Sequence, residues 1–345
     1  MKALLLIGGQ ATRLAPLSKT LPKSLLPVCD REILHYQITQ LALAGIGEIV
    51  LAAGHLVEQL RYFVEGYSGG LSFHFSIEPT PRGTAGAIAE ARDYLGGEPV
   101  VVLNADILSA IRIQEVVKRH RDGGRPATVV GFAVPDPSRY GLLRVEGDRL
   151  LGFSEKPEGE LGEGPHFINA GVYVLEYEAY REIPAGRPVS IERQTFPHLL
   201  ARHGSLSHYA HEGLWIDIGT FESYFQANFA LLARRYTGSD DWLWGQRDDC
   251  AIFKDLVMLS KSARLGSGVD LFHRVIVMRG ASIGEDCRLQ DCLVLPGASI
   301  GAGCRLRECI VGPGAMVAEG RQLANQVVID GEAETPFFPQ AVDGG

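Results

Sequence analysis

The chain has 345 residues, of which 46% are hydrophobic and 21% are charged, and its formal net charge is −8 at pH 7. This composition excludes a mainly disordered chain, and an acidic protein without a Lys/Arg cluster is not expected to bind nucleic acid. The length exceeds the roughly 100–200 residues of one ordinary domain, so we expect two domains.

Cysteine usage and hydropathy predict the cellular compartment of the protein. The first apolar run, residues 3–7, is much shorter than the roughly 18 residues that span a membrane, so no membrane partner is expected. The six cysteines, at positions 29, 250, 287, 292, 304 and 309, form no CxxC pair, and no secretory signal precedes them. We expect reduced thiols in a cytoplasmic protein.

Residues 1–235 alternate between strand and helix patterns. The continuous apolar run 2–7 is typical of a strand that is buried on both faces. Further strands are predicted at 48–53, 71–77, 99–103, 128–134, 142–153 and 167–175, with shorter ones in 206–217, and helices at 33–44, 56–65, 84–95 and 221–235. This order predicts an α/β, Rossmann-like domain with a mixed, mostly parallel sheet.

A repeat of 17 residues marks the C-terminal part of the chain. The pairs Ile283-Gly284, Ile300-Gly301 and Val317-Ala318 align, and a looser copy begins 18 residues earlier. Hexapeptide repeats with this period predict about four coils of a left-handed parallel β-helix over residues 263–333. We therefore expect a polar linker at 236–262 and a loose tail at 334–345.

The loop after the first strand has the residue types of a phosphate-binding site. Gly8 and Gly9 allow a close approach of backbone N–H groups to a phosphate, and Thr12 follows them. Arg13 offers a bidentate guanidinium, and Lys23 a second positive charge. Ligands bind at the carboxyl ends of strands in such sheets. The loop matches neither GxxxxGK[ST] nor GxGxxG, so it is not a P-loop or a dinucleotide fingerprint.

These residues resemble the signature of the sugar-1-phosphate nucleotidyltransferases, the family that makes nucleotide sugars. Five more segments match the family's motifs in the same order along the chain. They are the base-reading loop at 78–87, the metal-binding strand end at 103–106, the sugar-phosphate segments at 155–157 and 169–171, and the second metal-binding segment at 215–220.

The resemblance implies the roles of individual residues. Catalysis is expected from Arg13, Lys23 and Asp106, and metal binding from Asp106 and Asp217. The implied nucleotide-binding set is Gly8, Gly9, Thr12, Arg13, Lys23, Glu78, Gly83, Thr84 and Asp106, and the implied sugar-phosphate-binding set is Gly141, Glu155, Lys156, Asn169 and Gly171.

The chemistry of nucleotidyl transfer requires the same residue types. An anionic sugar phosphate must reach the α-phosphorus of an NTP while pyrophosphate leaves, so positive charge and positioning are needed. Mg²⁺ binds through a few carboxylates and keeps phosphate and water ligands. Asp106 and Asp217 each lie at a predicted strand end, and we expect them to hold Mg²⁺.

Several readings of the function remain open. The Gly83-Thr84-Ala85-Gly86 loop, the Ile33-Leu34-His35 helix start and the short β-helix resemble those of the mannose-1-phosphate guanylyltransferases. This resemblance implies GTP and mannose 1-phosphate as substrates. Thymidylyl or uridylyl transfer to glucose 1-phosphate is the alternative. A non-catalytic subunit that senses nucleotide sugars is another, because Ala11, Ala105 and Phe221 depart from the family pattern. The third alternative, favoured least, is an acyltransferase whose active site lies in the β-helix. We expect a homo-oligomer that assembles through the β-helix.

Overall fold

The computed structural model describes residues 1–8, 12–15, 17–19, 21–54, 56–67, 70–138, 140–154, 166–244, 249–329 and 332–334. The chain divides into two compact units, each built from two stretches of sequence. The sheet unit comprises Met1–Gln10 and Gln37–Trp215, and the C-terminal unit comprises Ala11–Tyr36 and Ile216–Gly345. Within the described residues, no helix is both long enough and apolar enough to span a bilayer.

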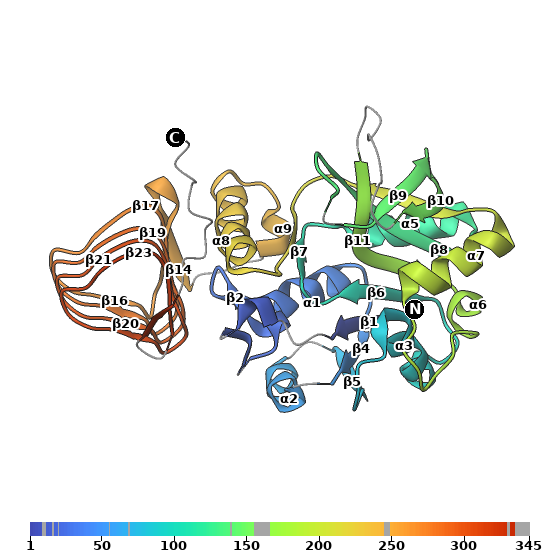
Figure 1. Cartoon of the computed structure of the whole chain (residues 1–345), viewed down its shortest axis with the longest axis horizontal. Coiled ribbons are helices and arrows are strands. Elements are labelled where there is room, and N and C mark those ends of the chain that lie inside the picture. The colour runs from blue at the N-terminus through green and yellow to red at the C-terminus, as the bar shows by residue number, and fades with distance from the viewer. Residues whose placement is uncertain are drawn as a thin grey trace. The chain divides into compact units, whose positions relative to one another are not determined.

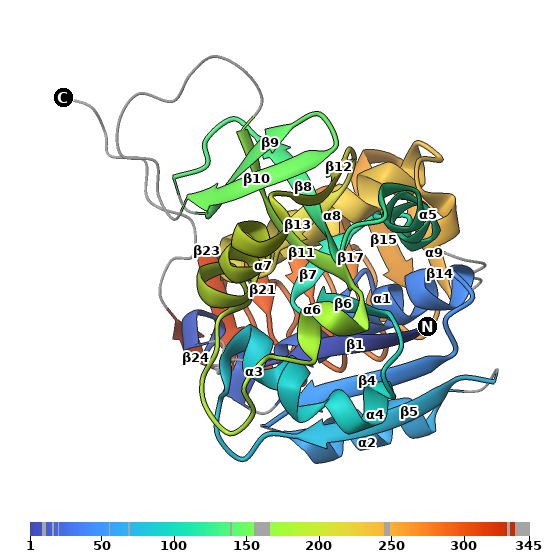
Figure 2. The same ribbon diagram turned by 90° about the vertical axis from the view of Figure 1, so that its right-hand side faces the viewer.

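The sheet unit is organised around a nine-stranded mixed sheet in the order β5-β4-β1-β6-β11-β8-β12-β10-β9 (Figure 2). The strands are β1 (Lys2–Ile7), β4 (Glu48–Ala53), β5 (Ser72–Ile77), β6 (Val100–Asn104), β8 (Ala127–Val134), β9 (Leu142–Glu146), β10 (Arg149–Ser154), β11 (His166–Leu175) and β12 (Leu206–His211). The first four strands of this order pair in parallel. β11 is antiparallel to both of its neighbours, so only one half of the sheet is mostly parallel.

Helices connect and cover these strands. They are α1 (Ile33–Leu43), which crosses the unit boundary, α2 (Val57–Glu65), α3 (Gly83–Glu90), α4 (Arg92–Leu95), α5 (Ile113–Gly123), α6 (Tyr177–Tyr180) and α7 (Phe196–His203), with a π turn at Ile191–Thr195 and the short strand β7 (Ile107–Ser109). The single helix predicted at 84–95 is interrupted at Ala91, and the single strand predicted at 142–153 is a hairpin that turns at Gly147, where φ is +59°. The helices α5 and α7 were not predicted.

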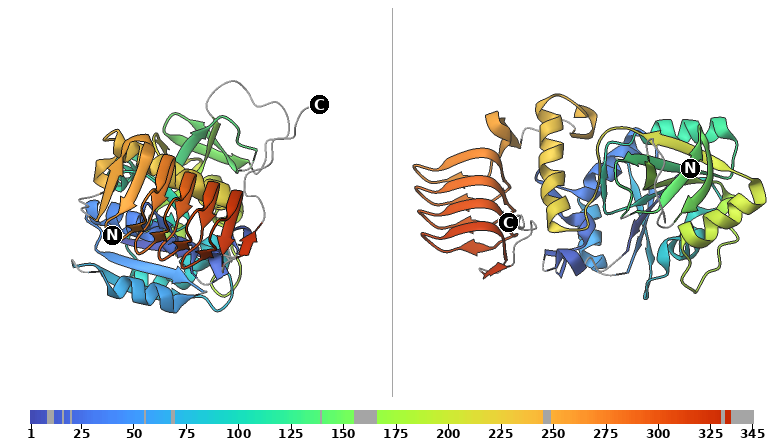
Figure 3. Two further views of the ribbon diagram at one scale, coloured as in Figure 1. Left: turned by 90° about the vertical axis from the view of Figure 1, so that its left-hand side faces the viewer. Right: turned by 45° about the horizontal axis from the view of Figure 1, so that its top comes forward.

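The C-terminal unit contains two stacks of short parallel strands (Figure 1, Figure 3). One sheet has the order β14-β15-β17-β19-β21-β23-β24 and the other β16-β18-β20-β22. Their bounds are β14 (Cys250–Phe253), β15 (Val257–Ser260), β16 (Arg264–Leu265), β17 (Asp270–Val277), β18 (Ser282–Ile283), β19 (Arg288–Val294), β20 (Ser299–Ile300), β21 (Arg305–Val311), β22 (Met316–Val317), β23 (Gln322–Ile329) and β24 (Glu332–Glu334). The outer strands β14 and β24 pair antiparallel with their neighbours and so cover the edges of the parallel ladder.

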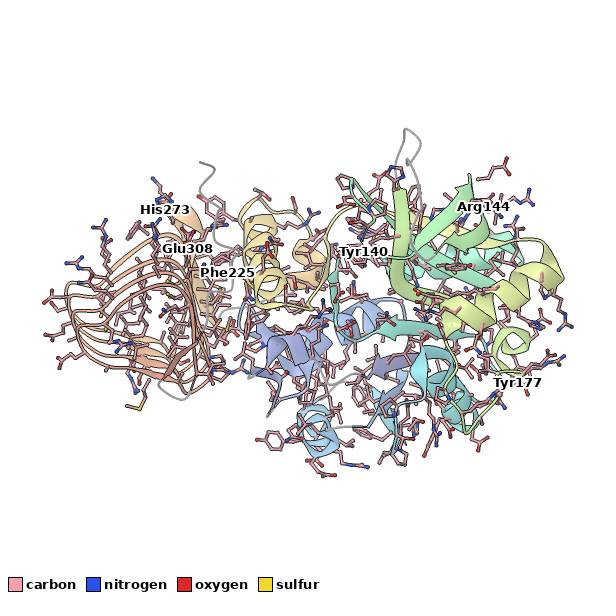
Figure 4. All side chains as sticks on the ribbon, in the orientation of Figure 1. Tyr140, Arg144, Tyr177, Phe225, His273 and Glu308 are labelled. Carbon is pink, nitrogen blue, oxygen red and sulfur yellow. The ribbon has the colours of Figure 1, made fainter. Side chains whose placement is uncertain are left out.

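The register of the ladder explains the 17-residue repeat. Leu289 pairs with Leu306 and Leu306 with Leu323, and all three are buried in one apolar core. The offset becomes 18 at the start of the ladder because β17 carries one extra residue between Phe272 and Val275. His273, which has φ +56°, lies in this bulge (Figure 4). A bulge of one residue accounts for the looser first copy of the repeat.

The remaining elements of the C-terminal unit come from both of its sequence stretches. They are the 3-10 turns η1 (Thr12–Leu14), η2 (Leu17–Lys19), η3 (Lys23–Leu25) and η5 (Lys254–Leu256), the hairpin strands β2 (Pro27–Val28) and β3 (Arg31–Glu32), and the helices α8 (Phe221–Tyr236) and α9 (Asp241–Trp244). The strand β13 (Trp215–Asp217) leads into α8. Thr220 caps α8 by accepting a hydrogen bond from the Ser223 N–H at 3.1 Å.

Candidate active site

The carboxyl ends of four parallel strands meet at one edge of the sheet unit. Ile7 of β1 is paired with Ala53 of β4, and Ala53 with Ile77 of β5, while Leu6 of β1 is paired with Asn104 of β6. The residues that follow these strand ends therefore share an edge, and they include Gly8, Glu78 and Asp106. This arrangement places three predicted nucleotide-binding residues where open α/β sheets bind ligands.

Side chains of the predicted base-reading loop accept hydrogen bonds from backbone N–H groups. The half-buried carboxylate of Glu78 accepts a hydrogen bond from the Arg82 N–H at 3.2 Å, and burial raises its pKa. Gly83 has φ +69°, and a Cβ there would lie 2.8 Å from the Val189 carbonyl oxygen. The Thr84 hydroxyl accepts a hydrogen bond from the Ile191 N–H at 3.0 Å. The loop thus packs against residues 189–191, and Gly83 is required by both backbone geometry and space.

The predicted sugar residues gather around Glu192, which the sequence analysis did not single out. The Asn169 amide donates hydrogen bonds to the Tyr173 hydroxyl, at 2.7 Å, and to the Glu192 carboxylate. The side-chain oxygen Oδ1 of Asn169 accepts a hydrogen bond from the Gly171 N–H at 3.0 Å. A Cβ on Gly141 would have the Glu192 carboxylate as its nearest neighbour, at 3.9 Å. Two predicted positions, Asn169 and Gly141, therefore lie close to one unpredicted acid, and Gly171 is linked to it through Asn169.

Glu192 carried little signal in the sequence. It stands two residues after Ser190, whose hydroxyl accepts a hydrogen bond from the Arg193 N–H at 3.2 Å and caps the π turn. Acidic residues are common in the first turn of a helical segment because they interact favourably with the helix dipole, so this position alone does not indicate a site. Asn169, which bonds to Glu192, and Thr84, which bonds to the adjacent Ile191, are distant in sequence, so only the folded chain shows the cluster.

The cations and the second carboxylate meet in the C-terminal unit. The Lys23 ammonium lies 3.4 Å from Asp217 Oδ1, across 194 positions of sequence. A Cβ built on Gly219 would lie 3.1 Å from the exposed Arg13 guanidinium and 3.6 Å from Asp217 Oδ1. Gly219 directly precedes the cap of α8. The unit thus places two positive charges beside a carboxylate at the start of a helix.

Some predicted residues are outside the described part of the chain. Gly9, Ala11, Glu155 and Lys156 are not among the described residues, and Thr12 is described only as the first residue of η1. Their predicted roles stay predictions. Gly171 is described, and with φ +69° it has no room for a Cβ, which would lie 2.7 Å from the Asn104 amide nitrogen.

Comparison with known families decides the class of the protein. The family profile described as "Nucleotidyl transferase" matches residues 2–234. The chain belongs to the nucleotidyl transferase family. A second profile, described as "GMPPB C-terminal domain", matches residues 253–335. The resemblance to the sugar-1-phosphate nucleotidyltransferases that the motifs indicated is confirmed.

Relatives of this family member come from several kingdoms. The catalytic subunit beta of mannose-1-phosphate guanylyltransferase from Danio rerio is 34% identical over 293 residues, covering 83% of this chain and 74% of the relative. Mannose-1-phosphate guanylyltransferase 1 of Arabidopsis thaliana is 34% identical over 294 residues with the same coverage.

Solved structures agree with the fold of the family. A Bacillus anthracis structure described as a glucose-1-phosphate thymidylyltransferase has a TM-score of 0.59 at 26% identity, covering 68% of this chain and 95% of its own. HddC from Yersinia pseudotuberculosis has a TM-score of 0.55 at 24% identity, covering 66% of this chain and 97% of its own, and supports the fold alone.

Proposed function

We propose that this sugar-1-phosphate nucleotidyltransferase uses GTP and mannose 1-phosphate and forms GDP-mannose and pyrophosphate. The observation that carries the proposal is the convergence of the base-reading loop and the sugar residues on residues 189–192. The names of the relatives, which are 34% identical, favour this pair of substrates.

The proposed reaction is an in-line displacement. A phosphate oxygen of the sugar phosphate attacks the α-phosphorus of GTP, and the bond from that phosphorus to the pyrophosphate oxygen breaks. Arg13 and Lys23 would neutralise phosphate charge during the transfer. In this reading the close Lys23–Asp217 contact, at 3.4 Å, orients the lysine before the substrate arrives.

The residues at the strand ends suit Mg²⁺. Asp106 and Asp217 offer hard carboxylate oxygens, and the buried Asn104 Oδ1, two positions before Asp106, has no hydrogen-bond partner among the described residues. Mg²⁺ takes one or two carboxylates and completes its octahedron with phosphate and water. We propose that Asp106 and Asp217 hold it. Bound Mg²⁺ would supply positive charge to the phosphate oxygens.

Recognition of the base and of the sugar would use different parts of the sheet unit. The Glu78 carboxylate has the acceptors for guanine N1–H and N2–H, and Gly83 admits the ring. Asn169 and Glu192 offer hydrogen-bonding groups for sugar hydroxyls, and we add Glu192 to the predicted set. Gly141, Gly171, Glu155 and Lys156 complete the proposed sugar-phosphate subsite.

The parallel strands of the C-terminal unit also have a proposed architecture and role. We propose that residues 263–333 form a left-handed β-helix, as the hexapeptide repeat and the 17-residue register suggest. In this proposal 1–235 is the catalytic domain and 236–262 is the linker, whose strands β14 and β15 extend the ladder. We also propose that a homo-oligomer assembles through this domain, on whose two outer strands of one sheet Leu265 and Met316 are 41% and 67% exposed. Six free cysteines accord with a cytoplasmic enzyme.

A pyrophosphate-release assay tests the substrates. GTP, dTTP, UTP, CTP and ATP are each combined with mannose, glucose, N-acetylglucosamine and heptose 1-phosphates in the presence of Mg²⁺. We expect GTP with mannose 1-phosphate to be the productive pair, and Asp106→Asn to lower its rate by at least about 100-fold.

The other outcomes discriminate the alternatives. Activity with dTTP or UTP and glucose 1-phosphate would favour the thymidylyl or uridylyl reading, which the Bacillus anthracis structure supports. If no pyrophosphate is released but GDP-mannose still binds, a regulatory subunit is favoured. Ala11, Ala105 and Phe221 are then the residues to return to the family pattern. Consumption of acetyl-CoA would be required for the acyltransferase reading.

A further inference from the structure

A strained hairpin follows the Lys23 turn. β2 and β3 are joined by the two residues Cys29 and Asp30, which have φ +47° and +67°. Two-residue hairpin loops with positive φ at both positions usually contain glycine or asparagine. Non-glycine residues keep such a conformation only where surrounding contacts impose it.

One set of these contacts comes from α8. The Cys29 N–H donates a hydrogen bond to Asn228 Oδ1 at 2.9 Å, and the Cys29 thiol donates to the Asn228 carbonyl oxygen at 3.1 Å. The Tyr224 hydroxyl, one helical turn earlier, donates to the Pro27 carbonyl oxygen at 2.5 Å. Asn228 and Tyr224 are fully buried. The hairpin is therefore clamped to the same helix that begins beside Asp217.

The other set comes from the parallel strands. Asp30 is buried, and its carboxylate oxygens each accept from the Arg279 N–H at 3.1 Å. The Arg279 guanidinium donates to the Asp30 carbonyl oxygen and to Glu32 Oε1, both at 2.7 Å. Arg279 lies in the turn between β17 and β18, and its own carbonyl oxygen accepts from the Gly297 N–H at 2.9 Å. Arg279 thus joins the hairpin to two successive levels of the ladder.

Backbone hydrogen bonds connect the short hairpin to Lys23. The Leu26 N–H donates to the Lys23 carbonyl oxygen at 3.1 Å, and the Leu26 carbonyl oxygen accepts from the Ile33 N–H at 3.2 Å. Leu25 and Leu26 are buried. A shift of the hairpin would therefore be transmitted to Lys23 within one turn of chain.

We infer that Arg279 is a positioning residue for Lys23 and acts through Asp30. This assigns the parallel strands a part in catalysis besides assembly, and it rests on the proposed function. Within the part of the chain that the structure describes, the hydrogen bonds of Arg279 go to Asp30, Glu32 and Gly297 and to no proposed substrate-binding residue, so its effect must pass through the hairpin. A misplacement of about 1 Å is enough to slow a positioned reaction about 100-fold.

The test compares three variants of the full chain. Arg279→Ala removes the guanidinium, Arg279→Lys keeps the charge with a single ammonium, and Arg288→Ala is the matched control. Arg288 is the first residue of β19, on the next level of the same ladder, and is similarly exposed (54% against 47% for the side chains). It pairs with Asp270 at 3.4 Å. All rates are measured at a temperature where circular dichroism shows every variant folded.

The expected pattern is specific to positioning. Arg279→Ala should lower kcat/KM by about 10- to 100-fold, Arg279→Lys should recover part of the loss, and Arg288→Ala should match the wild type. Amide hydrogen exchange at residues 22–32 should be faster in Arg279→Ala than in Arg288→Ala. Unchanged kcat/KM in folded Arg279→Ala, or an equal loss in Arg288→Ala, would overturn the inference.

A double-mutant cycle with Lys23→Met separates positioning from general damage. If Arg279 acts through Lys23, Arg279→Ala should have almost no further effect in the Lys23→Met background. Multiplicative losses would refute the route through Lys23. If the wild type releases no pyrophosphate, the proposed function fails, and the inference is decided by calorimetric GTP affinity. Arg279→Ala should then weaken binding about tenfold, and unchanged affinity would overturn it.

Discussion

Gly83→Ala offers a sharp test of the proposed base-reading loop. Gly83 begins α3 with φ +69°, and a Cβ at this position would lie 2.8 Å from the Val189 carbonyl oxygen and 3.3 Å from the Val189 carbonyl carbon. Both are backbone atoms, so no side-chain rotation relieves the overlap. The same carbonyl oxygen accepts hydrogen bonds from the Ala85 N–H at 3.0 Å and the Gly86 N–H at 3.2 Å.

Two physical effects set the size of the loss. The left-handed conformation costs an alanine about 1–2 kcal/mol. Moving the Val189 carbonyl weakens two hydrogen bonds, each worth about 1 kcal/mol. We therefore expect the free energy of unfolding of the sheet unit to fall by about 3 kcal/mol. Because Glu192 follows Val189 closely, kcat/KM should also fall by at least about tenfold.

Urea unfolding followed by circular dichroism measures the loss, and Gly45→Ala is the control. Gly45 has φ +75°, but a Cβ added at this position would meet nothing within 4 Å. Gly45→Ala should show only the conformational strain, about 1–2 kcal/mol, with unchanged kcat/KM. If Gly83→Ala is no less stable than Gly45→Ala, the overlap with Val189 is not real and the argument for the loop fails.

Three other predictions concern charge. Glu78→Gln should lower kcat/KM for GTP by about 10- to 100-fold in the pyrophosphate assay, because hydrogen bonds to a charged acceptor are strong; an unchanged value would remove Glu78 from base recognition. Lys23→Met should lower kcat/KM by at least about 100-fold in the same assay, whereas the surface variant Lys118→Met should not, and equal effects would refute the role of Lys23. Burial lowers the pKa of both His120 and His208, so the folded state favours their neutral forms. The contribution of these two histidines to the free energy of unfolding should therefore be fully present above about pH 6.5 and be lost as the pH falls below that value. Urea titrations should show a flatter pH profile in a His120→Gln, His208→Gln double variant, and an unchanged slope would contradict this assignment.

Local patterns in the sequence were sufficient for much of the fold. The 17-residue repeat predicted the stacked strands because each level of the ladder repeats the same inward positions, as Leu289, Leu306 and Leu323 do. The apolar run 2–7 and the segment ending at Asp106 predicted strands whose ends carry candidate ligands. Helix α5 also had an amphipathic pattern, with Ile113, Val116 and Val117 buried, and the sequence analysis overlooked it.

Only the tertiary structure decided which residues act together. Lys23 and Asp217 are 194 positions apart, and no periodicity or local spacing couples them. The closeness of Glu192 to Asn169, and the clamp of Arg279 on Asp30, likewise arise from chain paths that bring distant segments together. Sequence patterns report the environment that a residue needs, buried or exposed, turned or extended. They do not specify which distant partner supplies that environment, because this depends on the packing of whole elements.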